Sequence, residues 1–302
     1  MIESSTFPVE VSSLTKYYGQ HRGVEDVTFH VSPGEVLGCL GPNGSGKTTV
    51  LRVVMGLIRP TSGDVRIEGR SISVDPRTWR SHIGYLPGEL EIYENMTVES
   101  FLTFVARLRN RDCSQEIRRL ARRFELDTSA RISGLSKGNK QKVGVVQALM
   151  HRPSILVLDE PTSGLDPIAQ SNFAEIVRDR RDDGASIILS SHVLQEVEDV
   201  ADRIVILDHG RVLTVDTIDN LRAHIDTEIR MTFDHLVDIE PYRRCAGVRE
   251  VFATGHDVVV RAVPPHLEVL RRAVHDGVAK VVSHEANLTD VFIALTRSNH
   301  DS

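Results

Sequence analysis

The sequence predicts an α/β fold built on a parallel sheet, followed by a smaller α+β domain. An apolar strand at 36–40 runs into a glycine-rich loop and then into apolar residues at helical spacing. Two further near-continuous apolar runs, at 154–159 and 185–189, are typical of strands buried on both faces of a parallel sheet. A helix predicted at 167–180 connects these two runs, as a parallel connection requires.

The other elements of the larger part surround this sheet. Thr97 and Ser114 are predicted as the N-caps of two helices of a helical insertion. The predicted strands lie at 9–14, 24–31, 65–67, 83–87, 204–207 and 211–215, and the predicted helices lie at 76–81, 97–108, 114–124, 138–150 and 193–200.

A second unit is expected from residue 221 to residue 302, after a first domain at 9–220 whose helical subdomain spans about 89–150. It contains no cluster of residues with obvious chemistry, so it is interpreted as an accessory domain for packing or interaction. Its predicted strands lie at 228–233, 248–253, 257–263 and 279–283, and its predicted helices lie at 266–274 and 288–297.

Composition excludes several classes of protein. The formal net charge of −6 offers no global basic field, so no nucleic-acid partner is expected. Cys39, Cys113 and Cys245 have no metal-ligand spacing and are interpreted as reduced thiols of a cytosolic protein. There is no secretory signal and no run of about 18 apolar residues, so any membrane-spanning part is expected on another chain.

Residues 41–49 fit the pattern G-x-x-x-x-G-K-[ST] in the strand–loop–helix context that this motif needs. Backbone N–H groups of such a loop converge on an anion at a positive helix end. Lys47 adds a charge for the β- and γ-phosphates, and the Thr48 hydroxyl can ligate Mg²⁺. The candidate nucleotide-binding residues of the loop are Gly41, Pro42, Asn43, Gly44, Ser45, Gly46, Lys47, Thr48 and Thr49.

Two carboxylates end the apolar strand at 155–159. Asp159 is held at the strand end, where it can reach Mg²⁺ through water. Glu160 can accept a proton from the water that attacks the γ-phosphate, which makes it the candidate catalytic base.

The loop Leu135-Ser136-Lys137-Gly138-Asn139 resembles the signature loop of the ATP-binding cassette (ABC) family, usually LSGGQ. Ser136 and Gly138 match it, whereas Lys137 and Asn139 depart from the common form. The resemblance implies a P-loop NTPase core of ABC type, with an antiparallel β subdomain and a helical insertion. It also implies that these four residues act in trans, on the nucleotide of the opposite subunit.

Three further positions match the family. Asp166, in the run Ser163-Gly164-Leu165-Asp166, corresponds to the D-loop at the dimer seam, and His192 corresponds to the switch histidine that senses the γ-phosphate. Tyr18 matches the aromatic residue that stacks on adenine, and Tyr17 is the alternative, because strand alternation places only one of them on the nucleotide side.

One position departs from the family. Most members have a Gln that contacts Mg²⁺ and the attacking water where this chain has Gly88. Either water fills the missing ligand position or Glu89 supplies a carboxylate. The alternative for Glu89 is a solvated loop acid.

The resemblance covers residues 9–220, and a shorter match at 287–292 points to the drug and antibiotic exporter branch. It implies an ATPase that uses ATP and Mg²⁺ as a homodimer or a heterodimer with a related subunit. A separate transmembrane permease would hold it on the cytoplasmic face of the plasma membrane, for export of a small amphiphilic compound such as an antibiotic. ABC ATPases of translation and DNA repair carry two cassettes or long coiled-coil insertions, which this chain lacks, and the signature loop argues against a P-loop kinase.

Overall fold

The computed structural model describes residues 7–74, 79–223, 226–263 and 265–284. The chain divides into two compact units, Met1–Val215 and Asp216–Ser302. The domain boundary expected at residue 220 falls shortly after this division. Each unit is described by itself.

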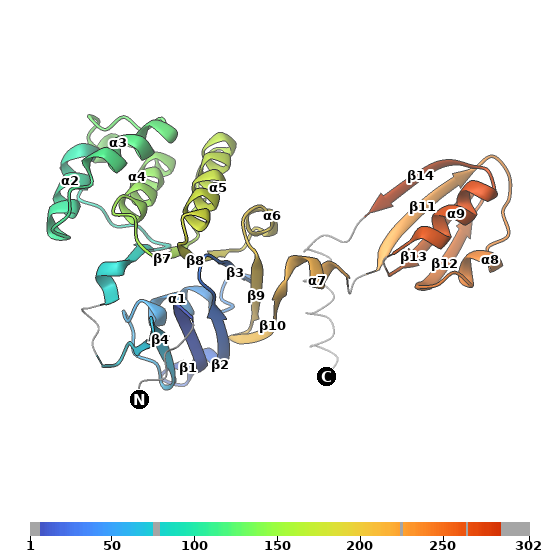
Figure 1. Ribbon diagram of the computed structural model, residues 1–302, viewed down its shortest axis with the longest axis horizontal. Coiled ribbons are helices and arrows are strands. Elements are labelled where there is room, and N and C mark those ends of the chain that lie inside the picture. Colours follow the sequence, from blue (N-terminus) through green and yellow to red (C-terminus); the bar gives the residue numbers. More distant parts are fainter. Residues whose placement is uncertain (1–6, 75–78, 224–225, 264, 285–302) are drawn as a thin grey trace. The chain divides into compact units, whose positions relative to one another are not determined.

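The first unit is built on a six-stranded sheet in the order β10-β9-β3-β8-β7-β6 (Figure 1). Neighbours from β9 to β6 pair in parallel, which confirms the predicted parallel sheet. Every residue of β3, β7 and β8 is buried, as their apolar runs indicate. The strands are β3 (Val36–Leu40), β6 (Ile83–Leu86), β7 (Ile155–Asp159), β8 (Ser186–Ser191), β9 (Arg203–Asp208) and β10 (Arg211–Thr217).

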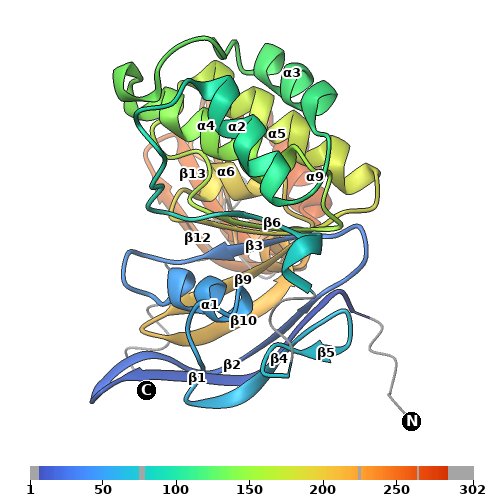
Figure 2. The ribbon, with the colours of Figure 1, turned by 90° about the vertical axis from the view of Figure 1, so that its left-hand side faces the viewer.

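An antiparallel sheet of four strands, in the order β2-β1-β4-β5, completes the core of this unit. Its strands are β1 (Val9–Tyr18), β2 (His21–Val31), β4 (Ser62–Ile67) and β5 (Arg70–Ser71). Helix α1 (Lys47–Val54) lies between the two sheets (Figure 2). Its buried residues Val50, Leu51 and Val53 share one apolar cluster with residues of both sheets, so the helix is fixed from two sides.

The helices of the insertion lie on the side of the parallel sheet that faces away from α1 (Figure 2). The helices of the insertion are α2 (Val98–Leu108), α3 (Ser114–Arg123) and α4 (Lys137–Leu149), with a short 3-10 turn at Ile132–Gly134 before α4. Outside the insertion, α5 (Pro167–Asp182) follows β7, α6 (Leu194–Glu198) follows β8, and a second 3-10 turn, Trp79–His82, precedes β6. Thr97 caps α2 as predicted, by accepting a bond from the Ser100 N–H. The predicted cap at Ser114 is wrong: Cys113 is the N-cap, and the Ser114 N–H is satisfied instead by Asp112.

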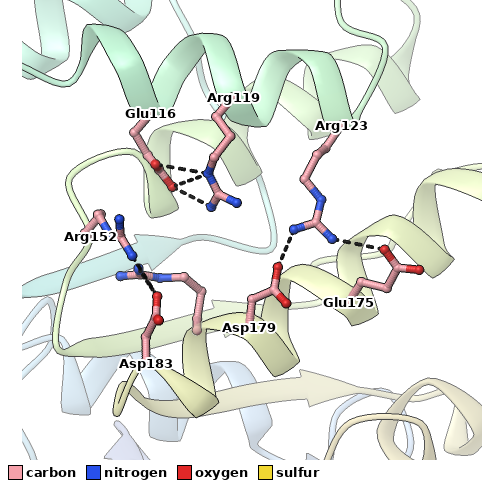
Figure 3. A network of polar contacts seen from close by, with 8 residues as sticks. Glu116, Arg119, Arg123, Arg152, Glu175, Asp179 and Asp183 are labelled. Carbon is pink, nitrogen blue, oxygen red and sulfur yellow. Dashed lines mark hydrogen bonds and ion pairs between the residues drawn. The ribbon is translucent and has the colours of Figure 1, made fainter.

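Ion pairs join α3 to α5 (Figure 3). Arg123, near the end of α3, donates to Asp179 and to Glu175 on α5, the latter at 3.0 Å. Asn172 of α5 donates to the Arg123 carbonyl at 2.8 Å, so both the side chain and the backbone of Arg123 are held. These contacts tie the helical insertion to α5, the helix that follows β7.

The second unit has a four-stranded antiparallel sheet in the order β12-β13-β11-β14. Its elements are α7 (Ile218–Ala223), β11 (Thr227–Phe233), α8 (Glu240–Arg243), β12 (Val248–Thr254), β13 (Asp257–Ala262), α9 (Leu267–His275) and β14 (Val278–His284). Phe233, Tyr242 and Val269 are buried in its separate core. The short helices α7 and α8 were not predicted, and the helix predicted at 288–297 lies outside the described residues.

Within the described ranges, no helix is both long and apolar enough to cross a bilayer.

Candidate active site

The glycine-rich loop joins β3 to α1 and borders a cavity of about 470 Å³. Gly46 is the residue before α1 and has a φ of +107°, which side chains rarely adopt. A Cβ at Gly46 would lie 2.4 Å from Val24 Cγ1 and 2.9 Å from the Gly23 carbonyl oxygen. The loop therefore packs against β2 so closely that only glycine fits, and this contact places the start of α1 at the cavity.

Most of the predicted nucleotide-binding residues line this cavity, and some do not. Gly41, Pro42, Ser45 and Asp159 lie beside it, and exposed Glu89 is not part of its lining. The lining residues are Tyr18, Arg22, Gly23, Asn43, Gly44, Gly46, Lys47, Thr48, Thr49, Gly88, Glu160, Ser163 and His192.

Lys47 is held by the loop that it follows. Its side chain is almost fully buried, and Nζ donates to the carbonyls of Gly41 at 2.7 Å and Pro42 at 3.2 Å. Glu160 Oε1 lies 3.8 Å from the same nitrogen. The ammonium group is thus fixed between the loop and Glu160, which directly follows β7, at the wall of the cavity.

Asp159 has the environment of a metal-binding carboxylate. It is fully buried, and its Oδ1 accepts bonds from Ser190 Oγ at 2.6 Å and Thr48 Oγ1 at 3.2 Å. Its Oδ2 is buried without a hydrogen-bond partner and lies 3.1 Å from where a Cβ of Gly88 would be. A hydroxyl beside an unpaired carboxylate oxygen fits the oxygen ligands that Mg²⁺ prefers. Among the residues that the structure describes, no group of three or more His, Cys, Asp or Glu side chains is placed to hold a metal ion.

Glu160 follows directly and adopts the left-handed region at a φ of +49°, which is uncommon for a residue with a side chain. Its N–H donates to both Ser190 Oγ at 3.0 Å and the Ser190 carbonyl at 3.2 Å. Its Oε2 lies 2.7 Å from His192 Nδ1. Ser190 of β8 therefore holds the backbone of Glu160, His192 holds its carboxylate, and Glu160 borders the cavity.

The two tyrosines at the end of β1 have different surroundings. The Tyr17 hydroxyl donates to Glu25 Oε1 at 3.1 Å, whereas the exposed ring of Tyr18 lines the cavity. Of the two rings, Tyr18 is the one that borders the cavity.

The signature residues do not reach this cavity. Ser136 caps α4 by accepting from the Asn139 N–H at 3.3 Å, and Lys137 and Gly138 form the first turn. A Cβ at Gly138 would lie 2.4 Å from the Gly164 carbonyl oxygen. Asp166 caps α5 through the Ala169 N–H, and that bond lowers the pKa of its carboxyl group.

Sequence reasoning missed two buried polar residues beside the carboxylates. Ser190 Oγ contacts both Asp159 and the Glu160 N–H. Gln141 on α4 donates to the carbonyls of Glu160 and Pro161. The sequence marks Ser190 and Gln141 only as polar residues within an apolar strand and an apolar helix face. This pattern does not show which groups their side chains contact.

The strand β3, the glycine-rich loop and the helix α1 occur in that order, and another strand of the same sheet, β7, ends at Asp159, directly before Glu160. This arrangement is that of a P-loop nucleoside triphosphatase. Residues 24–163 match the family model described as ABC transporter. The chain is 37% identical over 226 residues to the uncharacterized ABC transporter ATP-binding protein YxlF of Bacillus subtilis, spanning 73% of this chain and 75% of that protein. It is also 28% identical to the linearmycin resistance ATP-binding protein LnrL of the same species, spanning 93% and 92% of the two chains.

A solved structure supports the same assignment. The ATP-binding subunit of an ABC transporter superimposes with a TM-score of 0.66 at 36% identity, covering 71% of this chain and 91% of that chain. The chain belongs to the ABC transporter ATP-binding proteins. It is an ATP-binding subunit of such a transporter and an ATPase.

Proposed function

We propose that this subunit powers export of a small amphiphilic compound, such as an antibiotic, through a separate transmembrane permease. The similarity to LnrL over nearly the whole chain supports the substrate class, because removing an antibiotic from the cell is one physical route to resistance. The subunit would then work at the cytoplasmic face of the plasma membrane, held there by the permease.

The hydrolytic role rests on one observation: Glu160 and Lys47 face the same cavity from two elements, with Asp159 buried beside them. The loop N–H groups and Lys47 would bind the phosphates, while Thr48 and Asp159 would hold Mg²⁺, which supplies charge neutralisation when bound. Glu160 would take the proton of the attacking water, with His192 holding its carboxylate.

The separation of the motifs supports a dimer with two composite sites. Ser136, Lys137, Gly138 and Asn139 form one end of α4 and do not line the cavity of their own chain. One chain carries one phosphate loop and one signature loop, so two chains complete two sites. The partner is a second copy or a related subunit, and ATP between them favours the closed state until hydrolysis removes the bridging phosphate.

The second unit is proposed as an accessory domain for assembly with the partner subunit or the permease. Its separate core supports this role, because such a unit can hold its own shape outside the nucleotide-binding domain.

Glu160→Gln tests the hydrolytic role, since it keeps the shape of the side chain and removes the base. We expect ATP binding to survive and turnover to fall roughly 10²-fold or more. An ATP-bound dimer should accumulate. Lys47→Ala is the matched comparison, because it should weaken nucleotide binding itself. Wild-type turnover by the Glu160→Gln protein would remove Glu160 from this role.

A further inference from the structure

We infer that Gln141 is a positioning residue for Glu160, joining the signature helix α4 to the backbone of the proposed catalytic base in the same chain. The inference rests on the proposed role of Glu160. Gln141 lies in the second turn of α4, one turn after the Ser136 cap, and its side chain is nearly fully buried.

The amide of Gln141 holds two consecutive peptide groups. Its Nε2 donates to the Glu160 carbonyl at 3.2 Å and to the Pro161 carbonyl at 3.0 Å. A side-chain amide has two N–H donors, so both are used by this one stretch of backbone. Rotating or translating α4 would therefore move these carbonyls or break the two bonds.

The backbone at Glu160 needs such support. Its φ of +49° costs free energy for a residue with a side chain, and a conformation of this kind persists only when its surroundings hold it. Ser190 holds the N–H side of the residue and Gln141 holds the carbonyl side. Losing either support lets the peptide relax and turns the Glu160 carboxylate away from its position beside His192.

The start of α4 also contacts the segment after Glu160. Gly138 allows the Gly164 carbonyl to approach, and Lys142 Nζ lies 3.4 Å from Asp166 Oδ2. Together with Gln141, these contacts make the start of the signature helix and residues 160–166 one connected piece. In the proposed dimer, a nucleotide bound by the partner subunit would draw this chain's signature loop toward it and so act on that piece. Gln141 would then carry a change in the position of α4 to Glu160 of the same chain.

Gln141→Met tests this inference, because methionine keeps the length and the helix propensity of the side chain and removes both donors. We expect kcat for ATP hydrolysis to fall about tenfold or more, as misplacement of a reacting group by about 1 Å can cost. The KM and Kd for ATP should stay within about twofold, since Gln141 does not touch the cavity. Gln147→Met is the matched control: it is half-buried on the same helix, about 120° around the axis from Gln141.

A double-mutant cycle separates positioning from a general loss of structure. If Gln141 acts through Glu160, Gln141→Met should have little further effect on kcat in a Glu160→Gln background. Gln141→Asn is the second variant should the methionine protein not fold; it keeps the amide but is too short to reach both carbonyls, and the same fall in kcat is expected.

Three results overturn the inference: unchanged kcat in both Gln141 variants, equal losses in Gln147→Met, or losses that multiply with Glu160→Gln. Wild-type turnover by Glu160→Gln alone is a different failure, since it refutes the proposed base rather than the link to α4.

Discussion

Ser190→Ala is expected to weaken both the folded state and metal binding. The Ser190 hydroxyl donates to Asp159 Oδ1 at 2.6 Å and accepts from the Glu160 N–H at 3.0 Å, at a fully buried position. A hydrogen bond to a charged group contributes about 1.5–3 kcal/mol, and one between neutral groups about 1 kcal/mol. After the substitution, Thr48 still donates to Asp159 and the Ser190 carbonyl still accepts from the Glu160 N–H, both at 3.2 Å, and these bonds reduce the loss slightly. The free energy of unfolding should therefore fall by about 2–4 kcal/mol.

Two measurements check this expectation. Urea unfolding gives the stability, and a Mg²⁺ titration of ATPase activity should show a higher Mg²⁺ requirement, because Asp159 is no longer held in orientation. Ser191→Ala is the matched control for the titration: its hydroxyl also makes two bonds, to Glu196 and the Val193 N–H, but does not touch Asp159. A Ser190→Ala titration that superimposes on that of the wild type would refute the reasoning.

Three further expectations concern a buried histidine, the loop acid and the second unit. Burial, and then Arg109, lower the pKa of His151 from 6.5 to about 4, so the folded protein loses stability as the pH falls through this range. The loss should be about 3 kcal/mol between pH 6.5 and pH 4, and smaller in His151→Gln, as measured by urea unfolding. Glu89→Ala should raise the Mg²⁺ requirement for ATPase activity, and Gly88→Gln in that background should restore part of it; superimposable curves for wild type and Glu89→Ala would exclude the carboxylate as a ligand. Truncation near Leu221 should leave a folded domain that binds ATP with weaker dimer or permease association, whereas a well-behaved truncation that no longer binds nucleotide would place the domain boundary elsewhere.

The elements around the phosphate loop were predictable because local sequence determines them. Glycines at 41 and 46, with Lys47 and Thr48, occur at fixed spacing between a buried strand and a helix. The parallel sheet was predictable for a similar reason, since strands covered on both faces read as apolar runs. Fold class and family are confirmed by the sheet order and the comparisons, while the residue roles remain predictions.

Long-range contacts account for what the sequence could not show. Gln141 and Ser190 reach Glu160 from 19 and 30 positions away, and neither spacing is visible as a motif. Ser114 has a capping side chain, but the Cys113 carbonyl accepts the first helical bond, from the Ile117 N–H, so the helix already includes Ser114 and the cap is Cys113. Helix α8 is four residues long, too short to show a helical period.

Complementation between two inactive variants tests the composite site most directly. Lys47→Ala disables the phosphate loop, and Ser136→Asp keeps a capping oxygen for α4 while placing a negative charge where a phosphate would bind. Each variant alone should lack ATPase activity. If each site joins the phosphate loop of one subunit to the signature of the other, mixing the two should restore activity, because mixed dimers contain one intact site. Mixed protein that forms dimers but stays inactive, or activity in Ser136→Asp alone, would contradict the account.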